Sequence, residues 1–124
     1  MLDTNALSAF ADGDMALRRA IGDEADLAIP VVVLGEYVFG IRQSRHRSRY
    51  EGWLKEHLGA FLVLDIDAAT AIHYAAVRAE LRSAGRPIPS NDVWIAALSR
   101  RHRNALVTRD RHFEAVSEME LVTW

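Results

Sequence analysis

The sequence contains no cysteine, which excludes disulfide bonds, thiolate nucleophiles and zinc sites built from cysteine. No apolar run reaches the roughly 18 residues that a membrane-spanning helix needs. The first residues also lack the basic segment, apolar stretch and small-residue cleavage site of a secretory signal peptide. These absences predict a cytoplasmic protein without a membrane segment.

Lysine is almost absent as well, since fourteen of the fifteen basic residues are arginine and Lys55 is the only lysine. The planar guanidinium group of arginine matches the geometry of phosphate. The formal net charge is only −2, so the overall charge does not require a nucleic-acid partner. The arginines gather at residues 42–49 and 100–111, and these clusters are either candidates for phosphate contact or solvated faces produced by biased residue usage.

The remaining composition is that of an ordinary globular protein. Of the 124 residues, 50% are hydrophobic and 26% are charged, and we find no internal repeat, low-complexity tract or linker. A chain of this length can build one sizeable core. We therefore expect a single domain that spans residues 1–124.

The pattern of apolar residues predicts short strands that alternate with helices. Helices are expected at residues 4–10, 15–22, 31–42, 46–59, 68–84 and 92–102, with a short one inside residues 110–116. Strands are expected at residues 1–3, 25–29, 61–66, 105–109 and 120–124. This alternation is typical of an α/β fold with a short, mostly parallel central sheet and helices on both faces.

Single residues mark several of these boundaries. Pro30 suits the first turn of a helix, where its missing N–H costs nothing, although the valines that follow it favour a strand. Asp67 can cap the long helix at residues 68–84, and Gly85 can end it. Asp92 is expected to begin the helix at residues 92–102.

Three aspartates are expected at one edge of the predicted sheet. In parallel sheets, ligands bind beyond the carboxyl ends of the strands. Asp3 ends the first predicted strand, and Asp110 follows the strand at residues 105–109. Asp92 opens a helix at the same edge, where the helix dipole favours its ionised form.

Glu36 is a fourth candidate, because it is the only charged residue between positions 29 and 41. At helical spacing its neighbours are apolar or lack a side chain: Val32, Val33, Phe39 and Gly40. A buried carboxylate without a partner costs several kcal/mol. Glu36 is therefore expected to be protonated, to bind a metal, or to pair with an arginine from elsewhere in the chain.

Four clustered carboxylates repel one another, and hard divalent cations are their natural partners. The absence of cysteine and of a paired-histidine motif favours Mg²⁺ or Mn²⁺ over zinc. One or two such ions can activate water and stabilise the charge on a phosphodiester. Taken singly, each aspartate could equally be a turn residue or a helix cap, so the joint pattern carries the prediction of a metal site.

Four segments resemble one known family in order and spacing. They are "LDTN" at 2–5, "VLGEYVFGI" at 33–41, "GRPIPSNDVWIAA" at 85–97 and "LVTRDRHF" at 106–113. The chain resembles PIN-domain ribonucleases, in particular the VapC-like toxins of bacterial type II toxin–antitoxin pairs. The resemblance implies a three-layer PIN-like fold and a metal-dependent RNA endonuclease. It places Asp3, Glu36, Asp92 and Asp110 around Mg²⁺ or Mn²⁺, with Asn5 and Thr108 as supporting residues.

The resemblance also implies an RNA substrate, a small antitoxin protein as partner, and a homodimer. Arg86 and Arg109 are the arginines nearest the expected site, and they are candidates for contact with RNA phosphates. Only two residues precede Asp3, so the first strand is either truncated or begins upstream of this sequence. Asp3 is therefore expected near a terminus that frays.

Other interpretations remain open at this point. A PIN-like scaffold could bind RNA or a protein without catalysis, although it would be expected to lack one of the acids. "LDIDAAT" at 64–70 resembles the loop of haloacid-dehalogenase-like phosphatases, but its threonine comes one position late. A phospho-acceptor receiver domain needs a lysine on a late strand, whereas Lys55 lies in a predicted helix. A nuclease that cuts DNA flaps fits the short chain less well.

The histidines and tryptophans give no independent signal of a site. His46, His57, His102 and His112 stand in charged surroundings and are expected to be solvated, whereas His73 is expected to pack in its helix. The tryptophans are expected to be core or interface anchors: Trp53, Trp94 and Trp124.

Overall fold

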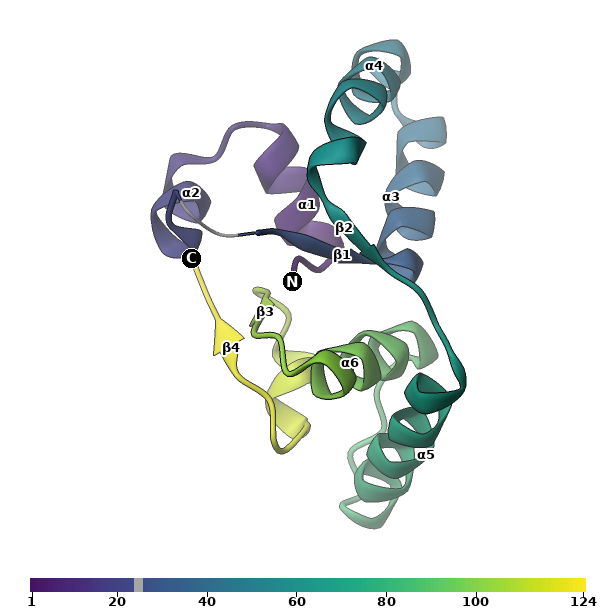
Figure 1. The fold of residues 1–124 in the computed structure, drawn as a ribbon. Coiled ribbons are helices and arrows are strands. Elements are labelled where there is room, and N and C mark those ends of the chain that lie inside the picture. The colour runs from purple at the N-terminus through teal and green to yellow at the C-terminus, as the bar shows by residue number, and fades with distance from the viewer. Residues whose placement is uncertain (24–25) are drawn as a thin grey trace.

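A computed structural model describes residues 1–23 and 26–124 (Figure 1). Its α-helices are α1 (Thr4–Ala11), α2 (Met15–Ile21), α3 (Val31–Gln43), α4 (Arg47–His57), α5 (Ala68–Ser83) and α6 (Ser90–His102). Its strands are β1 (Ala28–Pro30), β2 (Leu62–Leu64), β3 (Leu106–Val107) and β4 (Leu121–Val122). Two short 3₁₀ helices, η1 (Leu58–Ala60) and η2 (Arg111–Ala115), complete the order. The predicted alternation of strands and helices is confirmed.

The strands form two parallel pairs that the first residues of the chain connect. β1 pairs with β2, and β3 pairs with β4. Leu2 forms a parallel bridge to Val107 of β3, and its amide donates to the carbonyl of Ala28 at the start of β1 at 2.9 Å. The N-terminus consequently lies in the middle of the molecule, between the two pairs (Figure 1). The residue before Asp3 thus lies beside β1 and the last residue of β3.

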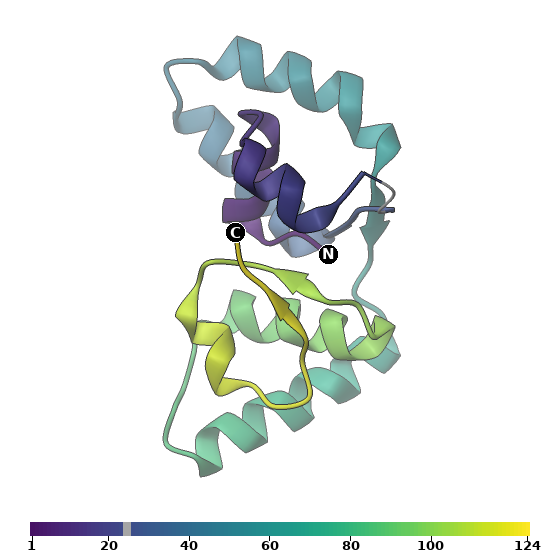
Figure 2. The same cartoon turned by 90° about the vertical axis from the view of Figure 1, so that its left-hand side faces the viewer.

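Helices cover both faces of the strands. In both views, α1 to α4 lie on one side and α5 and α6 lie on the other (Figures 1 and 2). The apolar side chains between these layers are buried and form one core, which includes Leu7 of α1, Val33 of α3 and Leu98 of α6. The expected three-layer α/β architecture is confirmed. Among the described residues, no helix combines the length and the apolar character that crossing a membrane requires.

The expectation that Asp3 lies near a fraying end is wrong. The Met1 ammonium group donates to the carbonyl of Ala105 at 2.8 Å, and the Val107 amide donates to the carbonyl of Met1 at 2.8 Å. Leu2 is fully buried, and Asp3 is only 4% exposed. Backbone hydrogen bonds to two neighbouring strands therefore hold Asp3, even though the segment before it is short.

The start of α6 differs from the prediction, whereas α3 begins at Val31 as expected. Pro30 ends β1 and lies just before the first residue of α3, so it does not occupy the first turn, and the valines after it are helical. α6 begins at Ser90, and Pro89 is the residue before it, so Asp92 is the third residue of the helix and does not cap it. The predicted start of the strand at Ala25 lies outside the described residues.

The long helix α5 begins and ends as expected. The Asp67 carboxylate accepts a hydrogen bond from the Thr70 amide at 2.8 Å, and the Thr70 hydroxyl interacts with the backbone of Asp67, which completes a capping box. Gly85 follows the helix with a φ of 63°, a left-handed conformation that glycine adopts without strain. Asp67 is therefore a structural cap, which removes the support for a phosphatase loop at residues 64–70.

Candidate active site

All four predicted acids line one cavity of about 200 Å³. The cavity is lined by Asp3, Thr4, Asn5, Glu36, Asp92, Ile95, Asp110 and Phe113. Its acids come from the start of α1, the middle of α3, the first turn of α6 and the residue that caps η2. The structure thus brings together residues that lie up to 107 positions apart, as the sheet-edge argument predicted.

Asp3 is the most buried of the four acids, and hydrogen bonds fix both of its oxygens. Oδ1 accepts from the Ala6 amide at 2.7 Å, which caps α1, and Oδ2 accepts from the Thr108 hydroxyl. Burial raises the pKa of Asp3 above its ordinary value, and the nearby charge of Asp110 acts in the same direction. The hydrogen bonds from Thr108 and Ala6 oppose this rise. These hydrogen bonds therefore hold the Asp3 carboxylate in a buried position, where its ionised form is unfavourable.

Thr108 connects two of the acids. Its buried hydroxyl donates to Asp3 and accepts from the Asp110 amide at 2.9 Å. This contact orients the Asp3 carboxylate and fixes the backbone from which the Asp110 side chain projects. The supporting role in the site that the resemblance implied for this threonine stays a prediction.

We expect the substitution Thr108→Val to destabilise the protein by about 1–3 kcal/mol, because it leaves a buried carboxylate oxygen and a backbone amide without partners. Urea unfolding monitored by circular dichroism measures the change. Thr123→Val is a matched control, because the Thr123 hydroxyl makes a single 3.3 Å hydrogen bond to the Thr108 carbonyl from an exposed position. Equal stability of the Thr108→Val variant and the wild type would contradict this role.

The Glu36 carboxylate lines the cavity and accepts hydrogen bonds from two neutral side chains. Its Oε1 accepts from the Asn91 side chain at 2.8 Å, and its Oε2 accepts from the Thr4 hydroxyl. The expectation of wholly apolar surroundings is wrong, because Phe39 is 66% exposed and Glu36 itself is half-buried. In the described part of the chain no arginine forms an ion pair with Glu36, so the pairing with an arginine that the sequence left open is not observed.

Asp92 and Asp110 share a neighbour that the sequence did not single out. Nδ1 of His112 lies 3.1 Å from Oδ2 of Asp92 and 3.3 Å from Oδ1 of Asp110. The His112 side chain is 52% exposed, so it is solvated as expected, but its Nδ1 also contacts two of the acids that line the cavity. The pKa of Asp92 is raised, chiefly by burial and also by the charges of Asp110 and Glu36, while the hydrogen bond with His112 opposes the rise.

Three residues of the site were therefore missed: Thr4, Asn91 and His112. Thr4 and Asn91 are direct sequence neighbours of two predicted acids, and neutral residues beside a predicted ligand are a weak signal that could have marked them. His112 stands two positions after Asp110, the same spacing that joins Thr108 to Asp110. That spacing was the available signal for His112.

The donors in the cavity fit a hard divalent cation. Across residues 1–23 and 26–124, no arginine or lysine forms an ion pair with any of the four acids. Ligand atoms of Asp92, Asp110 and His112 all lie within 4.8 Å of one another. Clustered carboxylates without an arginine or lysine partner are the oxygen-rich environment that Mg²⁺ and Mn²⁺ occupy in proteins.

The two arginines predicted to contact RNA do not line the cavity. The Arg109 Nε donates to the Trp124 carbonyl at 2.8 Å, and its guanidinium group lies 4.2 Å from the centre of the Trp124 ring. Arg86 is exposed in the loop that leads to α6. Contact of either residue with RNA stays a prediction.

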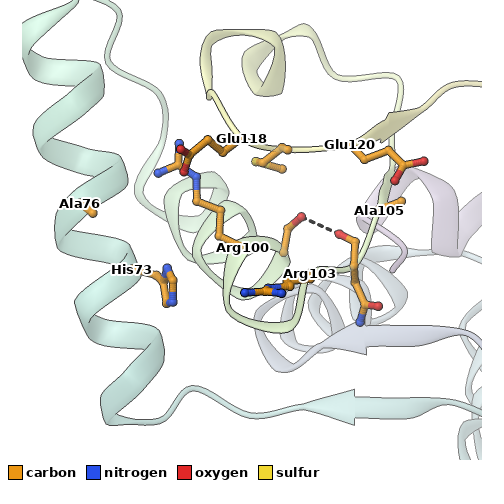
Figure 3. A pocket seen from close by; sticks show the side chains of 10 residues that line it. His73, Ala76, Arg100, Arg103, Ala105, Glu118 and Glu120 are labelled. Atoms are coloured by element: carbon orange, nitrogen blue, oxygen red, sulfur yellow. Dashed lines mark hydrogen bonds between the residues drawn. The ribbon is translucent and has the colours of Figure 1, made fainter.

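A larger hollow of about 500 Å³ lies between α5, α6 and the segment before β4 (Figure 3). It shares no lining residue with the acidic cavity. Its lining includes Arg100, Arg103, Glu118 and Glu120 (Figure 3). The Arg100 guanidinium group donates a hydrogen bond to Glu80 at 2.8 Å. Both basic and acidic side chains line this hollow, whereas every charged residue that lines the smaller cavity is an acid, so the smaller cavity is the stronger candidate for chemistry.

Known proteins match this chain over most of its length. Residues 1–119 match the model of the PIN domain. The chain is 31% identical to the tRNA(fMet)-specific endonuclease VapC of Shigella flexneri over 127 aligned positions, which cover 100% of this chain and 96% of that protein. It is 33% identical to ribonuclease VapC4 of Mycobacterium tuberculosis over 97 positions, which cover 77% of this chain and 75% of that protein.

Solved structures share the fold. The DNA-bound VapBC of Salmonella typhimurium superposes with a TM-score of 0.88 at 27% identity, and the match covers 100% of this chain and 96% of that one. VapBC2 of Rickettsia felis, bound to a promoter DNA fragment, gives a TM-score of 0.88 at 24% identity and covers 100% and 97%. The observed arrangement of strands and helices is therefore the one found in these toxin–antitoxin complexes.

Proposed function

The chain belongs to the PIN-domain family and resembles its VapC-like ribonucleases, and from that premise we propose that it is a metal-dependent endoribonuclease. The observation that carries this proposal is the convergence of Asp3, Glu36, Asp92 and Asp110 on one cavity, with no arginine or lysine paired to any of them among the described residues. A PIN-like scaffold without catalysis would be expected to lack one of these acids, and none is missing.

The four acids would hold Mg²⁺ or Mn²⁺, and the residues around them keep the oxygens in place. Thr108 orients Asp3, while Thr4 and Asn91 orient Glu36. When bound, the cation would lower the pKa of a water molecule and stabilise negative charge on the scissile phosphate. The same neutral neighbours would keep the carboxylates preorganised without competing for them as an arginine would.

The relatives support RNA as the substrate, since their names describe a ribonuclease and a tRNA-specific endonuclease. We propose that the protein acts in the cytoplasm as the toxin of a toxin–antitoxin pair, with a small antitoxin as partner. The similar solved structures are VapBC complexes, which supports this partner. A homodimer, and contact of Arg86 and Arg109 with RNA phosphates, belong to the same proposal.

The ends of the cleaved RNA test the chemistry of this proposal. If water attacks the phosphorus in line and the 3′ oxygen leaves, the products carry a 5′-phosphate and a 3′-hydroxyl. Attack by the ribose 2′-hydroxyl would instead give a 2′,3′-cyclic phosphate. Purified protein, incubated with total RNA and Mn²⁺, should produce fragments that ligate directly through their 5′-phosphates. Cyclic phosphate ends, or cleavage that is unchanged in EDTA, would refute the proposal.

A further inference from the structure

We propose that His112 is a direct ligand of the divalent cation and supplies one nitrogen donor beside the carboxylates. The inference rests on the proposed metal-dependent function and adds a residue to its site. The observation behind it is that His112 contacts two of the four acids, and no other histidine of the described chain contacts any of them.

The distances suit shared coordination. In an octahedral site with bonds of about 2.1 Å, adjacent ligand atoms lie about 3 Å apart. Nδ1 of His112 lies 3.1 Å from Oδ2 of Asp92 and 3.3 Å from Oδ1 of Asp110. Each distance is close to one edge of such an octahedron. A cation beside these three atoms would need little movement of the side chains to contact all of them.

The backbone around His112 is held in place before any ion binds. The Asp110 carboxylate caps η2 by accepting a hydrogen bond from the His112 amide at 2.9 Å. The next residue, Phe113, is 1% exposed and packs in the core below the cavity. Since the cap and the buried phenylalanine flank it, the imidazole is directed toward the acids although its outer edge is exposed to solvent.

A nitrogen ligand would change which cation the site prefers. Carboxylate and water oxygens suit both Mg²⁺ and Mn²⁺, whereas imidazole suits transition metals and is a poor ligand for Mg²⁺. His112 should therefore raise the affinity for Mn²⁺ relative to Mg²⁺. The alternative is that the Nδ1–H group donates a hydrogen bond to Asp92 and only orients this carboxylate. In that case the site would bind its cation through oxygen atoms alone.

Pulsed electron paramagnetic resonance on the Mn²⁺-loaded full-length protein separates the two cases. A directly bound imidazole nitrogen couples to the Mn²⁺ electron spin. We expect this ¹⁴N coupling in the wild type and in the control His102→Ala, which replaces an exposed histidine at the end of α6, and we expect its loss in His112→Ala. The buffer should contain no amine, and the protein no histidine tag.

Calorimetric titration of the same variants gives a second measurement. Loss of outer partners of metal ligands already lowers metal affinity 10- to 100-fold, so loss of a ligand should cost at least about tenfold for Mn²⁺. The loss for Mg²⁺ should be smaller. Bound Mn²⁺ without nitrogen coupling in the wild type, or coupling that persists in His112→Ala, would overturn the role of His112 and leave the proposed function standing. Failure of Mn²⁺ to bind at all would overturn both.

Discussion

Asp92→Asn is expected to lower RNA cleavage by more than about a hundredfold while the protein stays folded. Loss of a residue that only hydrogen-bonds to a metal ligand already lowers metal affinity or activity 10- to 100-fold. Loss of the charge of a ligand itself should therefore lower activity further. Asp92 forms no cap and lies half-buried in the third position of α6, so its replacement by an isosteric amide breaks no backbone contact. Initial cleavage rates on a defined RNA, with circular dichroism as the check on folding, measure the effect.

The same substitution should raise the melting temperature of the metal-free protein at neutral pH. The pKa of Asp92 is raised by burial and by the charges of Asp110 and Glu36, so its ionised form is unfavourable in the folded state. Asparagine removes that charge and keeps the shape. Loss of activity together with a gain in stability is the signature of a residue retained for chemistry.

Asp65→Asn is the matched control, because Asp65 is exposed just after β2 and does not line the cavity. This variant should cleave RNA at the wild-type rate and melt at the wild-type temperature. If Asp92→Asn and Asp65→Asn behaved alike, the acidic cavity would not be the active site.

Removal of the metal is the second change with a large expected effect. Treatment with EDTA followed by dialysis should abolish cleavage, and Mn²⁺ or Mg²⁺ should restore it. Because the cation binds only the folded protein, its return should also stabilise the fold, by about 2.7 kcal/mol when the free ion exceeds its dissociation constant 100-fold. Thermal unfolding with and without Mn²⁺ measures this stabilisation, and it should be smaller in Asp92→Asn.

The stability of the metal-free protein should depend on pH in a direction set by the raised pKa values of Asp3 and Asp92. Burial raises the pKa of both Asp3 and Asp92, so the folded protein holds these protons more tightly than the unfolded chain does. Their contribution to stability is therefore largest below the ordinary aspartate pKa and is lost as the pH rises through the raised values. Saturating Mn²⁺ should weaken this loss. A contribution from these two acids that grows with pH in the absence of metal would contradict the account.

Most of the fold could be predicted from local patterns. The alternation of apolar segments identified the helices and the parallel sheet, and Asp67 and Gly85 marked the ends of α5 correctly. The start of α6 was misplaced because Pro89 fixes the entry to the helix, and the side chain of Asp92 was taken for the cap. The firm position of Asp3 could not be predicted, since it depends on hydrogen bonds to strands that lie far along the chain.

The structure brings the four predicted acids to one cavity, but the reason given for Glu36 was only partly right. The Glu36 side chain is half-exposed and has polar neighbours. Its hydrogen-bond partners Thr4 and Asn91 lie 32 and 55 positions away in the sequence. His112 was missed for the same reason, because its contact with Asp92 spans 20 positions. Local spacing shows which side chains share a helix face or a strand edge. It does not show which elements pack against each other.

A crystal of the protein soaked in Mn²⁺ and measured near the manganese absorption edge tests the central claim most directly. The account predicts an anomalous peak inside the acidic cavity, roughly 2.1–2.3 Å from oxygens of Asp92 and Asp110, with the other two acids close by. The Asp92→Asn crystal, soaked in the same way, should show a much weaker peak. No peak in the cavity of the wild type, or a peak that lies only elsewhere on the protein, would contradict the claim that these carboxylates hold the catalytic cation.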